Sequence, residues 1–153
     1  MKGKDIFKLL VPGIFVSLIL GFAISMIVGV NPNDPIPNYI GWGVSCLVPT
    51  LLNGVVVLKS AAKELERELS IGSALKQNLL YVVISLIVGL VIGAGIIEYA
   101  LGVSTCDISR VTTAVSQAIT GAVVSTLFGY NAVVCYAKKV KYTKRTAKKT
   151  TKK

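Results

Sequence analysis

The chain has 153 residues, of which 53% are hydrophobic and only 16% are charged. Soluble domains average about 45–50% apolar and about 25% charged residues, so this composition argues against a water-soluble domain and predicts an integral membrane protein. The net charge of +10 would suggest a nucleic-acid binder in a soluble protein. In an apolar chain it indicates membrane orientation and a basic C-terminal segment.

Four windows are long and apolar enough to cross a bilayer, since a membrane-spanning helix needs about 20 residues with few charges. They cover residues 9–30, 39–58, 79–101 and 111–137. Helices are expected because open strands would leave backbone groups unpaired in lipid. The sequence therefore predicts an all-α integral membrane protein, a four-transmembrane-helix bundle that forms one membrane domain over residues 1–137.

The charges beside the spans predict the orientation of the chain. Sixteen of the 17 Lys and Arg residues lie before the first span, between the second and third spans, or after the fourth, and only Arg110 lies on the other side. Loops rich in Lys and Arg stay in the cytoplasm. We therefore expect a multi-pass protein of the cell membrane with both termini cytoplasmic, and a short cytoplasmic loop helix over residues 59–69.

The first span has a second interpretation. Basic residues followed by an apolar run are also typical of a cleaved secretory signal peptide, and Lys2, Lys4 and Lys8 precede the run here. The run of 22 residues favours a retained helix. Cleavage would leave three spans without changing the side that the tail faces.

Two segments that lie 68 residues apart are alike. Residues 15–27 and 83–95 are identical at five of thirteen positions, including Ser17 with Ser85 and Gly21 with Gly89. Each helical hairpin returns to the side on which it starts, so two copies would be parallel rather than inverted. The pattern predicts two tandem helical hairpins.

Small residues recur at every fourth position of three spans, which places each set on one helix face. They are Ser17, Gly21, Ser25, Gly29, Ser85, Gly89, Gly93, Gly121, Ser125 and Gly129. Small side chains let lipid-embedded helices approach closely. We expect helix-packing faces, either inside one chain or between chains; the functional alternative is a narrow pore.

Polar residues within the second, third and fourth spans form a candidate polar path: Asn53, Gln117, Thr120, Asn131 and Glu98. An unpaired amide is costly in lipid, so Asn53 and Asn131 are expected to form hydrogen bonds across helices. Glu98 lies near the outer end of its span, where it can reach water or Arg110. The alternative is that these groups only hold the helices together.

The last segment, residues 138–153, contains nine basic residues and no acid, and we expect a disordered cytoplasmic tail. Basic residues just inside a membrane attract anionic lipid headgroups. The candidates for this contact are Lys138, Lys139, Lys141, Lys144, Arg145, Lys148 and Lys149. Nucleic acid is not expected as a partner, because Tyr142 is the one aromatic residue available to stack on bases.

The sequence carries no recognisable catalytic motif. It contains no histidine, and Cys46, Cys106 and Cys135 form no CxxC pair, so we expect three free thiols, no metal site and no cofactor. The leading hypothesis is a non-enzymatic multi-pass membrane protein that is a structural or assembly subunit of a homo-oligomer or hetero-complex. The alternative is a small channel or transporter for an ion or small polar solute.

Overall fold

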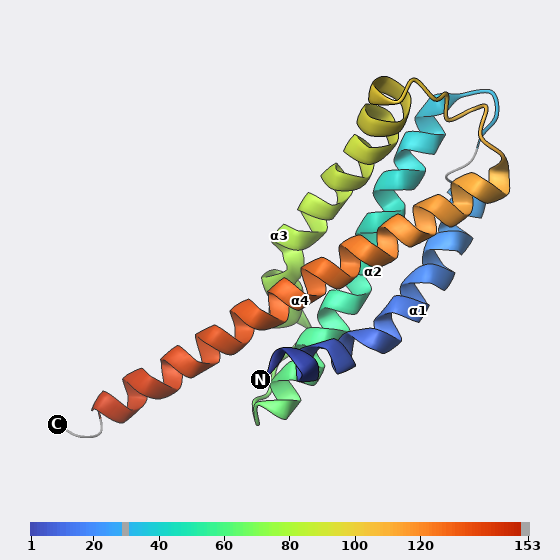
Figure 1. The fold of residues 1–153 in the computed structure, drawn as a ribbon. Coiled ribbons are helices and arrows are strands. Elements are labelled where there is room, and N and C mark those ends of the chain that lie inside the picture. Colours follow the sequence, from blue (N-terminus) through green and yellow to red (C-terminus); the bar gives the residue numbers. More distant parts are fainter. Residues whose placement is uncertain (29–30, 151–153) are drawn as a thin grey trace.

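A computed structural model of the chain describes residues 1–28 and 31–150, with side chains up to Thr143. Within these residues the fold is all-helical, and Figure 1 shows its elements in chain order: α1 (Gly3–Val28), α2 (Pro35–Glu64), α3 (Ile71–Leu90), η1 (Val91–Ala100) and α4 (Arg110–Thr150). Four helical segments of this described part are long and apolar enough to cross a membrane. The predicted all-helical architecture with four such segments is therefore confirmed.

The connection between α2 and α3 differs from the prediction. A separate loop helix over 59–69 does not form; instead α2 continues to Glu64, and the chain turns at Glu66, whose φ is 54°. The Ser70 hydroxyl then accepts a hydrogen bond from the Ser73 N–H at 3.2 Å. Because this N-cap satisfies a free backbone donor, α3 begins at Ile71, eight residues before the predicted start of the third span.

The third span changes its winding part-way along. Its first 20 residues are α-helical, whereas residues Val91–Ala100 wind as a π-helix, η1. Such helices are rare and wider than α-helices. The run Gly93, Ala94, Gly95 places small side chains in this segment, and Gly93 packs directly against the indole of Trp42.

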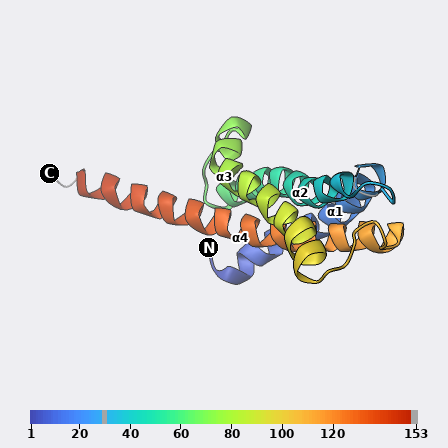
Figure 2. The same cartoon turned by 90° about the horizontal axis from the view of Figure 1, so that it is seen from above.

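The helices are packed around α2 and α4. Helix α1 lies against both of them, and α3 packs mainly on α2. The N-terminus, the connection from α2 to α3 and the C-terminal part of α4 lie toward one end of the bundle, as the two views show (Figures 1 and 2). The connections that follow α1 and η1 lie at the other end.

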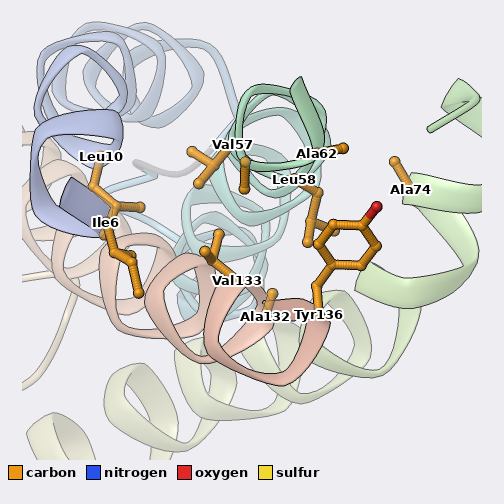
Figure 3. Close-up of a cluster of buried hydrophobic side chains, with 10 residues drawn as sticks. Ile6, Leu10, Val57, Leu58, Ala62, Ala74, Ala132, Val133 and Tyr136 are labelled. Atoms are coloured by element: carbon orange, nitrogen blue, oxygen red, sulfur yellow. The ribbon is translucent and has the colours of Figure 1, made fainter. Parts of the chain in front are cut away.

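An apolar cluster closes the end of the bundle that carries both termini. It brings together side chains from α1, α2, α3 and α4, and Figure 3 shows most of them. The largest members are Ile6, Leu10, Val57, Leu58, Val133 and Tyr136. Because all four helices contribute, the cluster fixes their relative positions at this end.

The C-terminal segment also differs from the prediction. Residues 138–150 are not irregular: α4 continues without a break to Thr150 and projects beyond the other helices (Figure 1). Lys, Arg and Ala are good helix formers, and they dominate this segment. The basic extension is therefore helical and continuous with the apolar part of α4.

Candidate functional site

The small-residue faces are buried inside the chain. A Cβ built on Gly21 would lie 2.9 Å from the Ala118 Cα of α4, and one built on Gly89 would lie 2.8 Å from the Gly43 Cα of α2. A Cβ on Gly129 would lie 3.0 Å from the Leu10 side chain of α1. Real Cβ atoms rarely approach so closely, so these positions are filled by neighbouring helices of the same chain. Gly29 lies outside the described residues.

Gly121 has the closest neighbour of the set, and the cause lies in α2. Pro49 lies inside that helix and has no N–H, so the carbonyl of Ser45, four residues earlier, loses its helical donor. Gly121 packs directly against this carbonyl, and a Cβ there would lie 2.9 Å from the Ser45 carbonyl carbon and nearer still to its oxygen. The absence of a side chain lets α4 pack directly on a backbone carbonyl that lacks its usual helical donor.

The serines of the same faces form hydrogen bonds between helices. The Ser17 and Ser125 hydroxyls are 3.1 Å apart and join α1 to α4, while Ser25 and Ser45 are 3.0 Å apart and join α1 to α2. Ser85 differs, because its hydroxyl donates to the Val82 carbonyl of its own helix. All five are buried.

Two buried amides add cross-helix bonds toward the end that carries the termini. Asn53 of α2 donates to the Gly13 carbonyl of α1 at 2.9 Å and to the Ser17 hydroxyl. Asn78 of α3 donates to the Thr50 carbonyl of α2 at 2.7 Å. These bonds hold α1 and α3 on opposite sides of α2.

A second network joins the connections at the far end. The Asn38 amide donates to the Asn31 carbonyl at 3.0 Å and to the Thr105 hydroxyl at 3.3 Å, and Gln117 donates to the Asn38 carbonyl at 3.3 Å. Thr105 in turn donates to the Glu98 carboxylate at 3.0 Å. Asn38, Thr105 and Gln117 are buried, so this network fixes the connections that follow α1 and η1 to α2 and α4.

The predicted polar path is only partly brought together. Asn53 and Gln117 are buried in the bundle, whereas Thr120 is half-buried and donates to the Ser116 carbonyl of its own helix. The expectation that Asn131 bonds across helices is wrong: it is exposed and donates to the Leu127 carbonyl at 3.0 Å.

The position of Asn131 follows from the helical repeat. Gly121, Ser125 and Gly129 define the inward face of α4, and Asn131 lies two residues beyond Gly129, about 200° around the helix. Glu98 was expected to reach water or Arg110; it is half-exposed, and its carboxylate accepts a hydrogen bond from the Thr105 hydroxyl at 3.0 Å. Arg110 instead donates to the Met26 carbonyl at 2.8 Å.

Sequence reasoning missed several buried residues of these networks. Thr105 lies in the connection between two apolar windows, and Asn38 and Asn78 each directly precede one. Both asparagines had one available signal, since a polar residue beside a span needs a partner. Asn78 packs against Gly54, where a Cβ would overlap the Asn78 amide.

The buried polar side chains of these networks are neutral hydrogen-bonding groups. In the described residues no cluster of three or more His, Cys, Asp or Glu side chains is placed to hold a metal ion. Cys46 is buried, Cys106 half-buried and Cys135 exposed, and all three are free thiols as expected. Three buried atoms, Trp42 Nε1, Asn78 Oδ1 and Thr113 Oγ1, have no hydrogen-bond partner in the described part of the chain.

The basic residues of the extension begin where the bundle ends. Lys138, Lys139 and Lys141 are exposed. The side chains of Lys144, Arg145, Lys148 and Lys149, also predicted to contact lipid, lie outside the described residues, although α4 includes their backbone. Comparison of the chain with protein-family models, with curated proteins and with solved structures gives no match.

Proposed function

We propose that this protein is a non-enzymatic multi-pass membrane subunit that presents a basic helix to a partner and to anionic lipid headgroups at the cytoplasmic face of the cell membrane. Both termini would lie in the cytoplasm, and the chain would consist of two tandem hairpins. The observation that carries the proposal is the continuity of α4, which runs from the buried Ser125 and Gly129 region into the exposed basic extension.

The continuity matters because a rigid extension has a fixed direction. At 1.5 Å per residue, residues 138–150 extend the helix by about 20 Å. A flexible tail would lose more conformational entropy when it docks. The bundle that supports it uses its glycines, serines and buried amides for its own packing, so the assembly surface that we propose is the extension rather than the small-residue faces.

The experiment compares two chains in native membranes: the full chain, and a chain that ends at Thr143. The shorter chain keeps Val140, which packs against the apolar cluster, but loses six basic residues. Native mass spectrometry of the extracted complexes should show a defined homo-oligomer or hetero-complex for the full chain and a monomer for the shorter one. The same subunit stoichiometry for the two chains would contradict the proposal.

A small channel or transporter is the second candidate. It is favoured by the buried polar groups that line the contacts of α2 with α1 and α4. It is also favoured by Trp42 Nε1 and Thr113 Oγ1, which have no hydrogen-bond partner among the described residues. Liposomes that contain the purified protein would then pass ions or small polar solutes faster than empty liposomes. An Asn53→Leu variant that abolished such flux without unfolding would favour this candidate over the subunit.

A further inference from the structure

A basic pocket lies where α2 ends and the chain turns into α3. Its volume is about 560 Å³, and its lining includes Lys59, Lys63, Arg67, Glu68 and Ser70. A smaller neighbouring pocket of about 230 Å³ shares Arg67 and Glu68 and adds Lys139 of α4. The two pockets are therefore neighbours at the end of the bundle where α2 turns into α3.

The charge of the pocket is strongly unbalanced. Three cations, Lys59, Lys63 and Arg67, face one carboxylate, that of Glu68. All four side chains are exposed, and none of the three cations forms an ion pair with a carboxylate among residues 1–28 and 31–143. Ammonium and guanidinium groups that lack a protein partner are suited to a phosphate, which Arg binds through two parallel hydrogen bonds.

The depth of the pocket matches the headgroup layer of a bilayer. The apolar window of α2 covers residues 39–58, and its 20 residues correspond to about 30 Å of helix, the thickness of the hydrocarbon core. Lys59 is the first charged residue after this window. The pocket thus begins where hydrocarbon gives way to headgroups.

An apolar stripe leads from the hydrocarbon to the pocket along one face of α2. Leu52, Val56, Ser60 and Lys63 follow one another at spacings of four, four and three residues, which places them on the same helix face. Leu52 and Val56 are 45% and 63% exposed. A molecule with an acyl chain and an anionic head would contact this stripe and the pocket at the same time.

We propose that the pocket binds the phosphate of an anionic membrane lipid, with an acyl chain against Leu52 and Val56. Lys63 and Arg67 contact the phosphate, and Glu68 weakens the attraction. The site goes beyond the proposed function, because it lies on α2 and the loop after it and requires neither the α4 extension nor a protein partner.

The test measures lipid retention by native mass spectrometry of the full chain, purified with either phosphatidylglycerol or phosphatidylcholine. The full chain should retain phosphatidylglycerol selectively. Replacing both Lys63 and Arg67 by Gln should weaken retention about 100-fold, taking about tenfold for each charge-assisted hydrogen bond to the phosphate that is lost. Glu68→Gln should strengthen it, and a gain of binding cannot come from misfolding.

A matched control removes the same charge from the same end of the bundle. Lys2 and Lys4 are exposed and do not line the pocket, so the double change Lys2→Gln and Lys4→Gln should leave retention unchanged. Equal losses in the control and the pocket variant would show that only net charge matters and would overturn the proposal. So would equal retention of phosphatidylcholine, or inorganic phosphate that binds and displaces the lipid, since the site would then serve a soluble anion.

Discussion

Gly121→Ala is the change that tests the packing of the bundle most sharply. The added methyl carbon would lie 2.9 Å from the Ser45 carbonyl carbon, and closer to its oxygen. These are backbone atoms of α2, so they cannot rotate away as a flexible side chain would. Helix α4 must move away from α2, which separates the two central helices of the bundle.

The expected cost is that of overpacking a well-packed core, about 1–3 kcal/mol. For a chain of this length, each kcal/mol lowers Tm by about 2–4 °C, so we expect Tm to fall by about 2–12 °C. The assay is thermal unfolding in detergent, at a protein concentration where the chain is monomeric. Because no second copy is bound under this condition, a fall in Tm reports contacts between helices of one chain.

The matched control is Gly72→Ala. Gly72 lies in the first turn of α3, and a Cβ there would meet no atom within 4 Å. Ala is up to about 1 kcal/mol better than Gly in a helix, so this variant should be as stable as the parent or slightly more so. The reasoning fails if the Gly121 variant unfolds at the same temperature as the Gly72 variant, or if it loses stability only where the chain self-associates.

Three further predictions follow from the contacts of the bundle. Asn53→Leu removes two cross-helix hydrogen bonds and should lower the free energy of unfolding by about 0.6–2 kcal/mol. Asn131→Leu, on the outward face of α4, should change the free energy of unfolding little. Equal effects of the two variants in thermal unfolding would contradict the assigned helix faces. The protein in membranes should retain α1, because Ser17 and Ser25 form bonds with α4 and α2; an intact mass that shows cleavage after the first span would refute this. Finally, a maleimide added to the folded protein in detergent should modify Cys135 and not Cys46, which is fully buried; rapid modification of Cys46 under native conditions would argue against its position between the helices.

The sequence was sufficient to predict the spans because composition and length alone decide whether a segment can cross a bilayer. It was also sufficient to find Gly21, Gly89 and Gly121, since a spacing of four residues places them on helix faces. The helix neighbour of each glycine could not be predicted, because the spacing is the same for contacts inside one chain and contacts between chains. The structure assigns these contacts to neighbouring helices within the chain.

The prediction for Asn131 failed because it considered only the cost of an unpaired amide in lipid and not the helix face on which the residue lies. Asn131 lies about 200° from Gly129 around α4 and is exposed. The extent of the helices was also underestimated. Ser70 caps α3 beyond the apolar window, and Lys-rich segments form helices readily once a neighbouring turn is already helical.

The proposed roles of the extension and the basic pocket both require that they lie at the cytoplasmic face of the membrane. The most direct test is therefore to measure which side of the membrane each end of the bundle faces. In a background in which Cys46, Cys106 and Cys135 are replaced by Ala or Ser, single cysteines would be introduced by Asn33→Cys and Lys138→Cys, at two exposed positions on opposite ends. A membrane-impermeant maleimide added to intact cells should label position 33, and it should label position 138 only after the cells are permeabilised. Labelling of position 138 in intact cells would contradict the orientation and, with it, the proposed roles of the extension and the pocket.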